Sequence, residues 1–134
     1  MMAAVVRISV QTREPDHLLQ AEAVRLGADV LVYIWGGERP HIGAVAAAQP
    51  RPSLADPART SATASVLTYV GHKEDVVAKT VAEALAARLA TNVVVTAGIH
   101  WDNLPATGIA MVMERCRELI ELLQHALEAD RHRE

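Results

Sequence analysis

The chain has 134 residues, of which 51% are apolar and 22% charged, and its formal net charge at pH 7 is −3. This length and composition fit one globular domain with an ordinary hydrophobic core, and they exclude most multidomain enzymes. The charge balance lacks the basic excess that draws a protein to nucleic acid or to an anionic membrane surface.

Neither a membrane anchor nor a disulfide is expected. Polar or charged residues interrupt every apolar run well short of a membrane span, and the N-terminal residues make a poor signal peptide. The single cysteine, Cys116, excludes an internal disulfide. We therefore expect a cytoplasmic protein.

Four stretches in the first part of the chain have the patterns of β-strands. Residues 6–11 alternate apolar and polar side chains, as in a strand with one face on a core. Residues 18–26 fit both a helix face and a strand alternation, and we favour a strand. Residues 30–35 are continuously apolar, as in a central strand buried on both faces. Residues 42–48 resume extended structure after a tight connection, so the third and fourth strands should form a hairpin.

A proline-rich loop, a fifth strand and a first helix follow. Residues 49–60 contain three prolines and are expected to form the one long irregular loop. Residues 61–70 are small, rich in threonine and extended. Apolar side chains at helical spacing then predict a first helix over residues 73–90.

A sixth strand and a second helix complete the chain. Residues 93–97 form a strand closed by Gly98, and apolar residues from 109 to 127 mark a long amphipathic helix. Residues 130–134 are expected to be a frayed tail. The order β-β-β-β-β-α-β-α predicts a single α+β domain over residues 1–134, a mixed sheet of about six strands with two helices packed on it.

Three glycine-rich segments, each carrying a histidine, should meet at one edge of this sheet. If the third strand runs upward, the fourth descends, the fifth rises, the first helix descends and the sixth strand rises again through a right-handed crossover. Ligands in such sheets tend to lie outside the carboxyl ends of parallel strands. The segments are residues 36–43, 71–75 and 97–103, and they should bring His41, His72, His100, Lys73 and Asp102 into one pocket.

The segment that precedes the first helix suits an anion. Free N–H groups and the positive dipole end of the helix would favour a phosphate, and Lys73 adds a full charge. The same residues also fit a glycine turn at Gly71, followed by Glu74 and Asp75 stabilising the start of the helix.

The histidines allow a second chemistry, and other residues suggest none. His41, His72 and His100 could bind a divalent metal with a carboxylate, although metal ligands are usually paired along one element and these are scattered over separate loops. Cys116 lies on the apolar stripe of the second helix and is expected in the core. No role is expected for three other histidines, which are His17, His125 and His132.

Together the three segments resemble the small LpdD-like proteins, which are encoded beside UbiD-type decarboxylases and are regarded as prenylated-flavin chaperones. The resemblance spans most of the chain. That family is similar in fold to proteasome assembly chaperones and is usually dimeric. The motifs that carry it are Gly36-Gly37 with Pro40-His41-Ile42-Gly43, Gly71-His72-Lys73-Glu74-Asp75, and Gly98-Ile99-His100 with Asp102-Asn103.

The resemblance implies a non-catalytic homodimer that binds prenylated FMN, or FMN, and delivers or matures it in a UbiD-type decarboxylase. Lys73 would hold the phosphate, glycine backbones would lie against the flavin, and histidines would bond its ring edge. Trp101 would stack on the ring, while Trp35 is expected in the core. A metal-dependent enzyme using the three histidines and a ligand-free assembly scaffold remain open. The implied cofactor-binding residues are Gly36, Gly37, His41, Gly43, Gly71, His72, Lys73, Glu74, Gly98, His100, Asp102 and Asn103, with no catalytic residue and no metal ligand.

Overall fold

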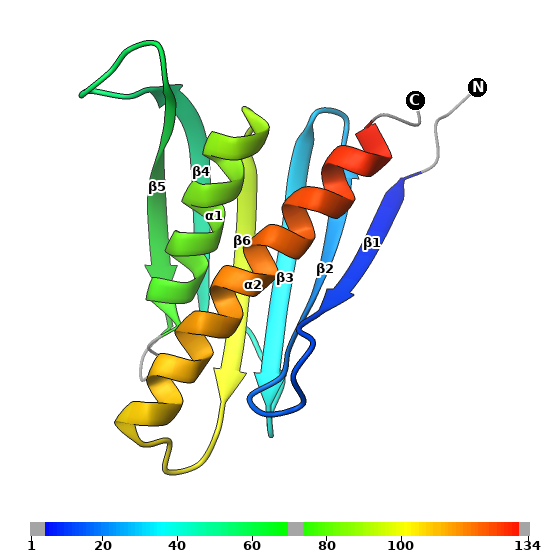
Figure 1. Ribbon diagram of the computed structural model, residues 1–134, viewed down its shortest axis with the longest axis vertical. Helices are drawn as coiled ribbons and strands as arrows, with labels where there is room; N and C mark the ends of the chain where they lie inside the picture. Colours follow the sequence, from blue (N-terminus) through cyan, green and yellow to red (C-terminus); the bar gives the residue numbers. More distant parts are fainter. Residues whose placement is uncertain (1–4, 70–73, 132–134) are drawn as a thin grey trace.

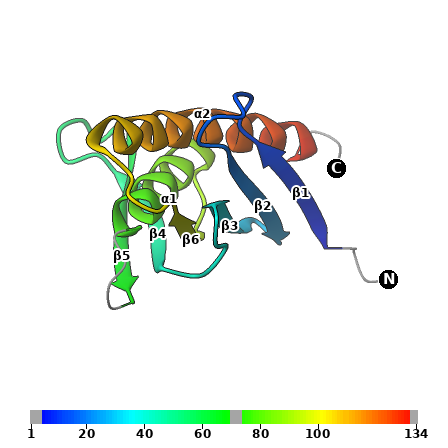
Figure 2. The same cartoon turned by 90° about the horizontal axis from the view of Figure 1, so that it is seen from below.

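The computed structural model describes residues 5–69 and 74–131, and its elements follow the predicted order (Figure 1). Its six strands form one mixed sheet in the order β1-β2-β3-β6-β4-β5, and both helices lie on the same face of it (Figure 2). The predicted α+β class is therefore confirmed. The elements are β1 (Val6–Gln11), β2 (Leu19–Leu26), β3 (Asp29–Gly37), β4 (Ala44–Pro52), β5 (Thr60–Thr68), α1 (Asp75–Leu89), β6 (Val93–His100) and α2 (Ala106–Arg131).

Small side chains set how closely α1 packs on the sheet. The face of α1 that meets the sheet carries Ala78, Ala82 and Ala86, all fully buried. Opposite them, β4 presents Ala44 and Ala46, also fully buried. Alanine on both surfaces lets the helix backbone approach the strands closely, while leucine and valine fill the space beside it.

The predicted hairpin between the third and fourth strands is wrong, because β6 lies between them. β6 pairs in parallel with β3, with Val32 opposite Val95, and antiparallel with β4, with Ala46 opposite the same Val95. β6 is mostly apolar and none of its residues is exposed, as expected for a strand with a neighbour on each side. The connection 38–43 therefore spans the end of β6 instead of making a tight turn.

The predicted irregular loop over residues 49–60 is also largely wrong. β4 continues to Pro52, where it pairs with Thr60 of β5, so that only residues 53–59 connect the two strands. β4 pairs with β6 only as far as Ala48. Beyond that point β4 has β5 on one side alone, so Pro50 and Pro52 break no ladder on the other side.

Two element ends differ from the sequence prediction. β6 does not stop before Gly98 but runs on to His100. α2 extends to Arg131, and Asp130 near its end lies 3.4 Å from Arg25 of β2, so the expected frayed tail begins no earlier than residue 132, outside the described residues. No described helix is long and apolar enough to cross a membrane.

The carboxyl ends of β3 and β6 and the starts of both helices lie at one edge of the sheet, at the bottom of Figure 1. Backbone hydrogen bonds tie these segments together there: Glu38 N donates to His100 O at 2.8 Å, and Gly43 N donates to Ala97 O at 2.9 Å. The predicted convergence of the loop containing His41 with the loop containing His100 is therefore confirmed.

Candidate functional site

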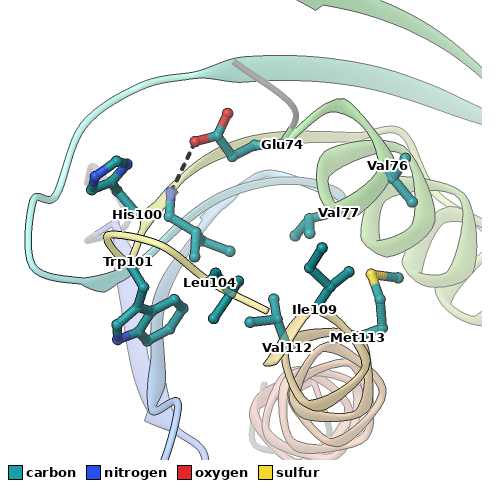
Figure 3. Close-up of a pocket in the computed structure, with 10 residues that line it drawn as sticks. Glu74, Val76, Val77, His100, Trp101, Leu104, Ile109, Val112 and Met113 are labelled. Atoms are coloured by element: carbon teal, nitrogen blue, oxygen red, sulfur yellow. Dashed lines mark hydrogen bonds between the residues drawn. The ribbon is translucent and has the colours of Figure 1, made fainter. Parts of the chain in front are cut away.

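A cavity of about 480 Å³ opens at this edge, between the starts of α1 and α2 and the end of β6 (Figure 3). Apolar side chains from both helices point toward one another around it, and two ionisable side chains, those of Glu74 and His100, lie on one side of it. Its lining residues are Glu74, Val76, Val77, Ile99, His100, Trp101, Leu104, Ile109, Val112 and Met113.

Glu74 is the buried ionisable group of this cavity. It directly precedes α1 and is only 8% exposed. Its Oε1 atom lies 2.9 Å from Nε2 of His41 and accepts a 3.4 Å hydrogen bond from the backbone N–H of Ile99. A side chain at Gly43 would occupy the space that the Glu74 carboxyl group fills. Glu74 thus ties the connection 38–43 to the end of β6.

The hydrogen bonds of His41 fix where its protons lie. Its Nδ1 lies 2.7 Å from the carbonyl oxygen of Arg39, which can only accept, so Nδ1 carries a hydrogen. A further proton is shared between Nε2 and Glu74, because a carboxylate cannot donate to an imidazole nitrogen.

His100 belongs to a more exposed polar cluster at the rim of the cavity. Its Nε2 lies 2.8 Å from Oδ1 of Asp102 and 2.9 Å from Nη2 of Arg39, and Arg39 also contacts Asp102 at 3.3 Å. The hydrogen bond from His100 is the main cause that lowers the pKa of Asp102, with a second contribution from its contact with Glu38. Asp102 is therefore a carboxylate at neutral pH.

The glycines of the predicted motifs contact the protein itself. Gly37 has a φ of +80°, and a β carbon there would collide with the carbonyl oxygen of His100. A β carbon on Gly98 would collide with the carbonyl oxygen of His41. One on Gly36 would lie 2.6 Å from Cδ2 of Leu19. These glycines allow the loops of the site to pack on one another.

Trp101 separates the apolar cavity from a second one of about 400 Å³. It lines both, and the second also includes His17, Gln20 and Glu38. The imidazole of His17 meets the indole of Trp101 edge-on, with ring centroids 5.2 Å apart. His17, for which the sequence suggested no role, therefore supports the tryptophan that the two cavities share.

The structure distributes the other predicted site residues as follows. The prediction of one shared pocket is wrong for the described residues. His100 lines the 480 Å³ cavity, Asp102 lies beside His100 outside that wall, and His41 lines a separate cavity of about 340 Å³ with Tyr33 and Trp35. Asn103 lies in the connection between β6 and α2 with a φ of +54°. Among the described residues, no three histidine, cysteine or acidic side chains are grouped to hold a metal ion. Gly71, His72 and Lys73 lie outside the described residues.

Sequence reasoning missed Arg39 and most of the apolar wall of the cavity. Ile109 and Met113 were read only as core positions of a helix. A signal was present, because residues 103–113 contain no charged side chain although several of them are exposed. An uncharged, exposed first turn of a helix indicates a surface with a function other than solvation.

Cys116, as predicted, is a core residue. It is fully buried, and burial raises the pKa of its thiol to about 12. The thiol therefore stays protonated at neutral pH and is not a nucleophile.

The fold is that of proteasome assembly chaperones. The structure has a TM-score of 0.56 to a chain from the crystal structure of a chaperone complex for yeast 20S proteasome assembly, at 17% identity, with 90% of this chain and 96% of the other covered. Residues 13–128 match the family described as "Prenylated flavin chaperone LpdD-like domain". Protein LpdD of Lactiplantibacillus plantarum is 28% identical, over 90% of this chain and 88% of that protein. The chain thus belongs to the LpdD-like chaperone family, as its motifs predicted.

Proposed function

We propose that the chain binds prenylated FMN at the 480 Å³ cavity and delivers or matures it in a UbiD-type decarboxylase. Membership of the LpdD-like family supports a chaperone that serves another protein. The observation that carries the proposal is the cavity itself, which lies at the edge of the sheet where the described parts of the family motifs meet.

The residues of the cavity fit a flavin. Its volume lies within the range of about 300 to 1,000 Å³ that small-molecule sites occupy. Its wall is mostly apolar, which suits the dimethylbenzene side of the ring and an added prenyl group. Trp101 offers a face for stacking, while Glu74 and His100 can hydrogen-bond the polar ring edge.

The mouth of the cavity suits a ligand that must leave again. Val76 on α1 and Ile109 on α2 line the cavity and are 53% and 55% exposed. Exposed apolar side chains at a mouth fit transient contact with a second protein, which would receive the ligand. The chain's own residues bind and orient the cofactor in this proposal, and the chemistry that the cofactor supplies takes place in the decarboxylase.

The test is a calorimetric titration of the purified protein with FMN and with prenylated FMN. We expect both to bind, the prenylated form more tightly because it buries additional apolar surface. The variant Met113→Trp should fill the cavity and abolish binding, since Met113 lines it. Met111→Trp is the matched control, because Met111 lies on the same helix but outside the cavity wall.

Two results would contradict the proposal. Equal binding by the Met113→Trp variant and the parent would place the ligand elsewhere. Stoichiometric binding of zinc or manganese without any flavin would favour the metal-dependent enzyme. Coexpression with a prenylating flavin enzyme, followed by the absorbance spectrum and mass of what copurifies, identifies the natural ligand.

A further inference from the structure

We infer that Arg39 holds the phosphate group of the ligand, an inference that rests on the proposed function. Arg39 lies in the connection between β3 and β4, with its side chain 69% exposed. Among the described residues, neither the 480 Å³ cavity nor the 400 Å³ cavity has a lysine or arginine in its wall. The guanidinium of Arg39 reaches their shared rim through its contact with His100.

The contacts of His100 contain a hydrogen-bonding conflict. Its Nε2 atom is 2.8 Å from Asp102, whose carboxylate can only accept, and 2.9 Å from Arg39, whose guanidinium can only donate. One ring nitrogen cannot donate to Asp102 and accept from Arg39 at the same time. The three side chains therefore have two exclusive arrangements, one with His100 bonded to Asp102 and one with His100 bonded to Arg39.

A phosphate resolves this conflict. When Nε2–H of His100 donates to Asp102, Arg39 loses its bond to His100 and keeps its 3.3 Å contact with Asp102, so most donors of the guanidinium are open. An arginine fork then matches phosphate oxygens, and charge-assisted bonds of this kind are stronger than neutral ones. The carboxylate of Asp102 lies 3.3 Å from Arg39, so a phosphate competes with it, and the bond from His100 to Asp102 weakens that competition.

The position of Arg39 also suits the shape of the ligand. Its chain neighbours Glu38 and Pro40 line the polar cavity, whereas His100 lines the apolar one. Arg39 thus stands where the two cavities meet. A planar ring in the apolar cavity would leave its polar tail at this rim. The class of ligand is therefore a phosphate monoester attached to a flat, largely apolar ring.

The other anion site suggested by the sequence is less favourable in the described residues. The start of α1 carries two acidic side chains, Glu74 and Asp75, and Glu74 is buried in the cavity wall. A phosphate at that helix end would meet both carboxylates. At the rim, the guanidinium of Arg39 offers a full positive charge, whereas the described residues at the helix start offer only the partial charge of the helix end.

The experiment compares Arg39→Gln with the parent by calorimetric titration with FMN, with riboflavin and with inorganic phosphate. We expect Arg39→Gln to weaken FMN binding by about tenfold or more and to leave riboflavin binding nearly unchanged. Arg59→Gln is the matched control, because Arg59 lies in the connection 53–59 at the opposite end of the sheet (Figure 1). It should retain the parent preference for FMN.

A second measurement reports directly whether Nε2 of His100 carries a hydrogen. Nitrogen NMR of the labelled histidine should show Nε2 as the protonated nitrogen once FMN is bound, and riboflavin should not produce this change. Inorganic phosphate should compete with FMN in the parent and not in Arg39→Gln.

The outcomes separate this inference from the proposed function. An Arg39→Gln variant that keeps the parent preference for FMN over riboflavin overturns the role of Arg39 and leaves flavin binding intact. Equal affinity of the parent for FMN and riboflavin also overturns the role of Arg39 and leaves flavin binding intact. A parent that binds neither flavin overturns the proposed function, and the role of Arg39 with it.

Discussion

The glycines beside the histidines show which part of a site a sequence can reveal. Their pairing in three segments predicted where the loops converge, and the structure confirms that location for the segments it describes. The sequence also led to the expectation that the backbones of these glycines contact a flavin, whereas the structure shows them against other parts of the protein. The β-carbon positions of Gly37, Gly43 and Gly98 are filled by the carbonyl oxygen of His100, the carboxyl group of Glu74 and the carbonyl oxygen of His41. Glycine indicates close approach, but only the structure says what approaches.

Lys73 remains the cation that the sequence places before α1, outside the described residues. If it contacts the phosphate, Lys73→Ala should weaken FMN binding by roughly ten- to a hundredfold, because a charge-assisted contact contributes about 1.5 to 3 kcal/mol. Titration with FMN and riboflavin measures the effect. Lys79→Ala is the control, since Lys79 is an exposed lysine of the same helix. An equal loss in both variants would mean that only the overall charge matters.

The thiol of Cys116 should be unreactive in the folded protein. The thiolate is the reactive form, and a pKa of about 12 leaves roughly one thiol in ten thousand ionised at pH 8. A disulfide reagent that absorbs on reaction should therefore detect no thiol at pH 8 until a denaturant is added. Because burial raises the folded-state pKa, labelling should accelerate as the pH rises toward 12. Rapid labelling of the native protein at pH 8 would show that α2 opens locally.

At the scale of elements, alternation along the chain predicted the strands, and it could not predict their neighbours. Every predicted strand exists, and the ambiguous residues 18–26 contain β2. The hairpin was predicted because short connections usually join adjacent strands. β6 lies between β3 and β4 because it is apolar on both faces, with Val93 and Val95 under the helices and Val94 on the opposite face. Such long-range pairing depends on which strands need burial most, and no local pattern records it.

The end of α2 is held to the sheet by one buried arginine. Nη2 of Arg25 donates to the carbonyl oxygen of Leu127 at 2.8 Å, and Nε lies 3.4 Å from Asp130, while the arginine side chain is only 9% exposed. We expect Arg25→Met to lower the free energy of unfolding by about 2 kcal/mol, because a partly buried carboxylate and a helix-end carbonyl lose their partner. Urea unfolding followed by circular dichroism measures this.

Arg7→Met is the control for that measurement. Arg7 also pairs with an acidic residue across strands, at 3.5 Å from Glu22, but its side chain is 65% exposed. An exposed ion pair contributes about 0 to 1 kcal/mol, so the control should lose little stability. If both variants unfold at the same urea concentration, Arg25 does not anchor α2.

At the scale of the whole molecule, the two faces of the sheet differ. Both helices cover one face (Figure 2), and the other has half-buried apolar side chains at its centre. Residues 30–35 were predicted to be buried on both faces, and Trp35 was predicted in the core. In the single chain Trp35 instead lies on the uncovered face, stacked on Tyr33 with ring centroids 6.1 Å apart. The sequence thus predicted more burial than one copy provides. The central apolar side chains of this face are Leu31, Tyr33, Trp35, Val45 and Val94.

We therefore expect a homodimer in which two copies pack through their uncovered sheet faces. Sheets that pack face to face bury side chains from both inner surfaces, and the alternation of β3 provides such a surface. Sedimentation of the parent at micromolar concentration should give a dimer. Leu31→Asp places a charge at the centre of this face and should weaken association by roughly a hundredfold, since buried central positions dominate interface energies. Leu54→Asp introduces the same charge at a side chain that is 91% exposed in the connection 53–59, and should leave the dimer intact. A monomeric parent, or a Leu31→Asp variant that remains dimeric, would show that the second copy does not cover this face.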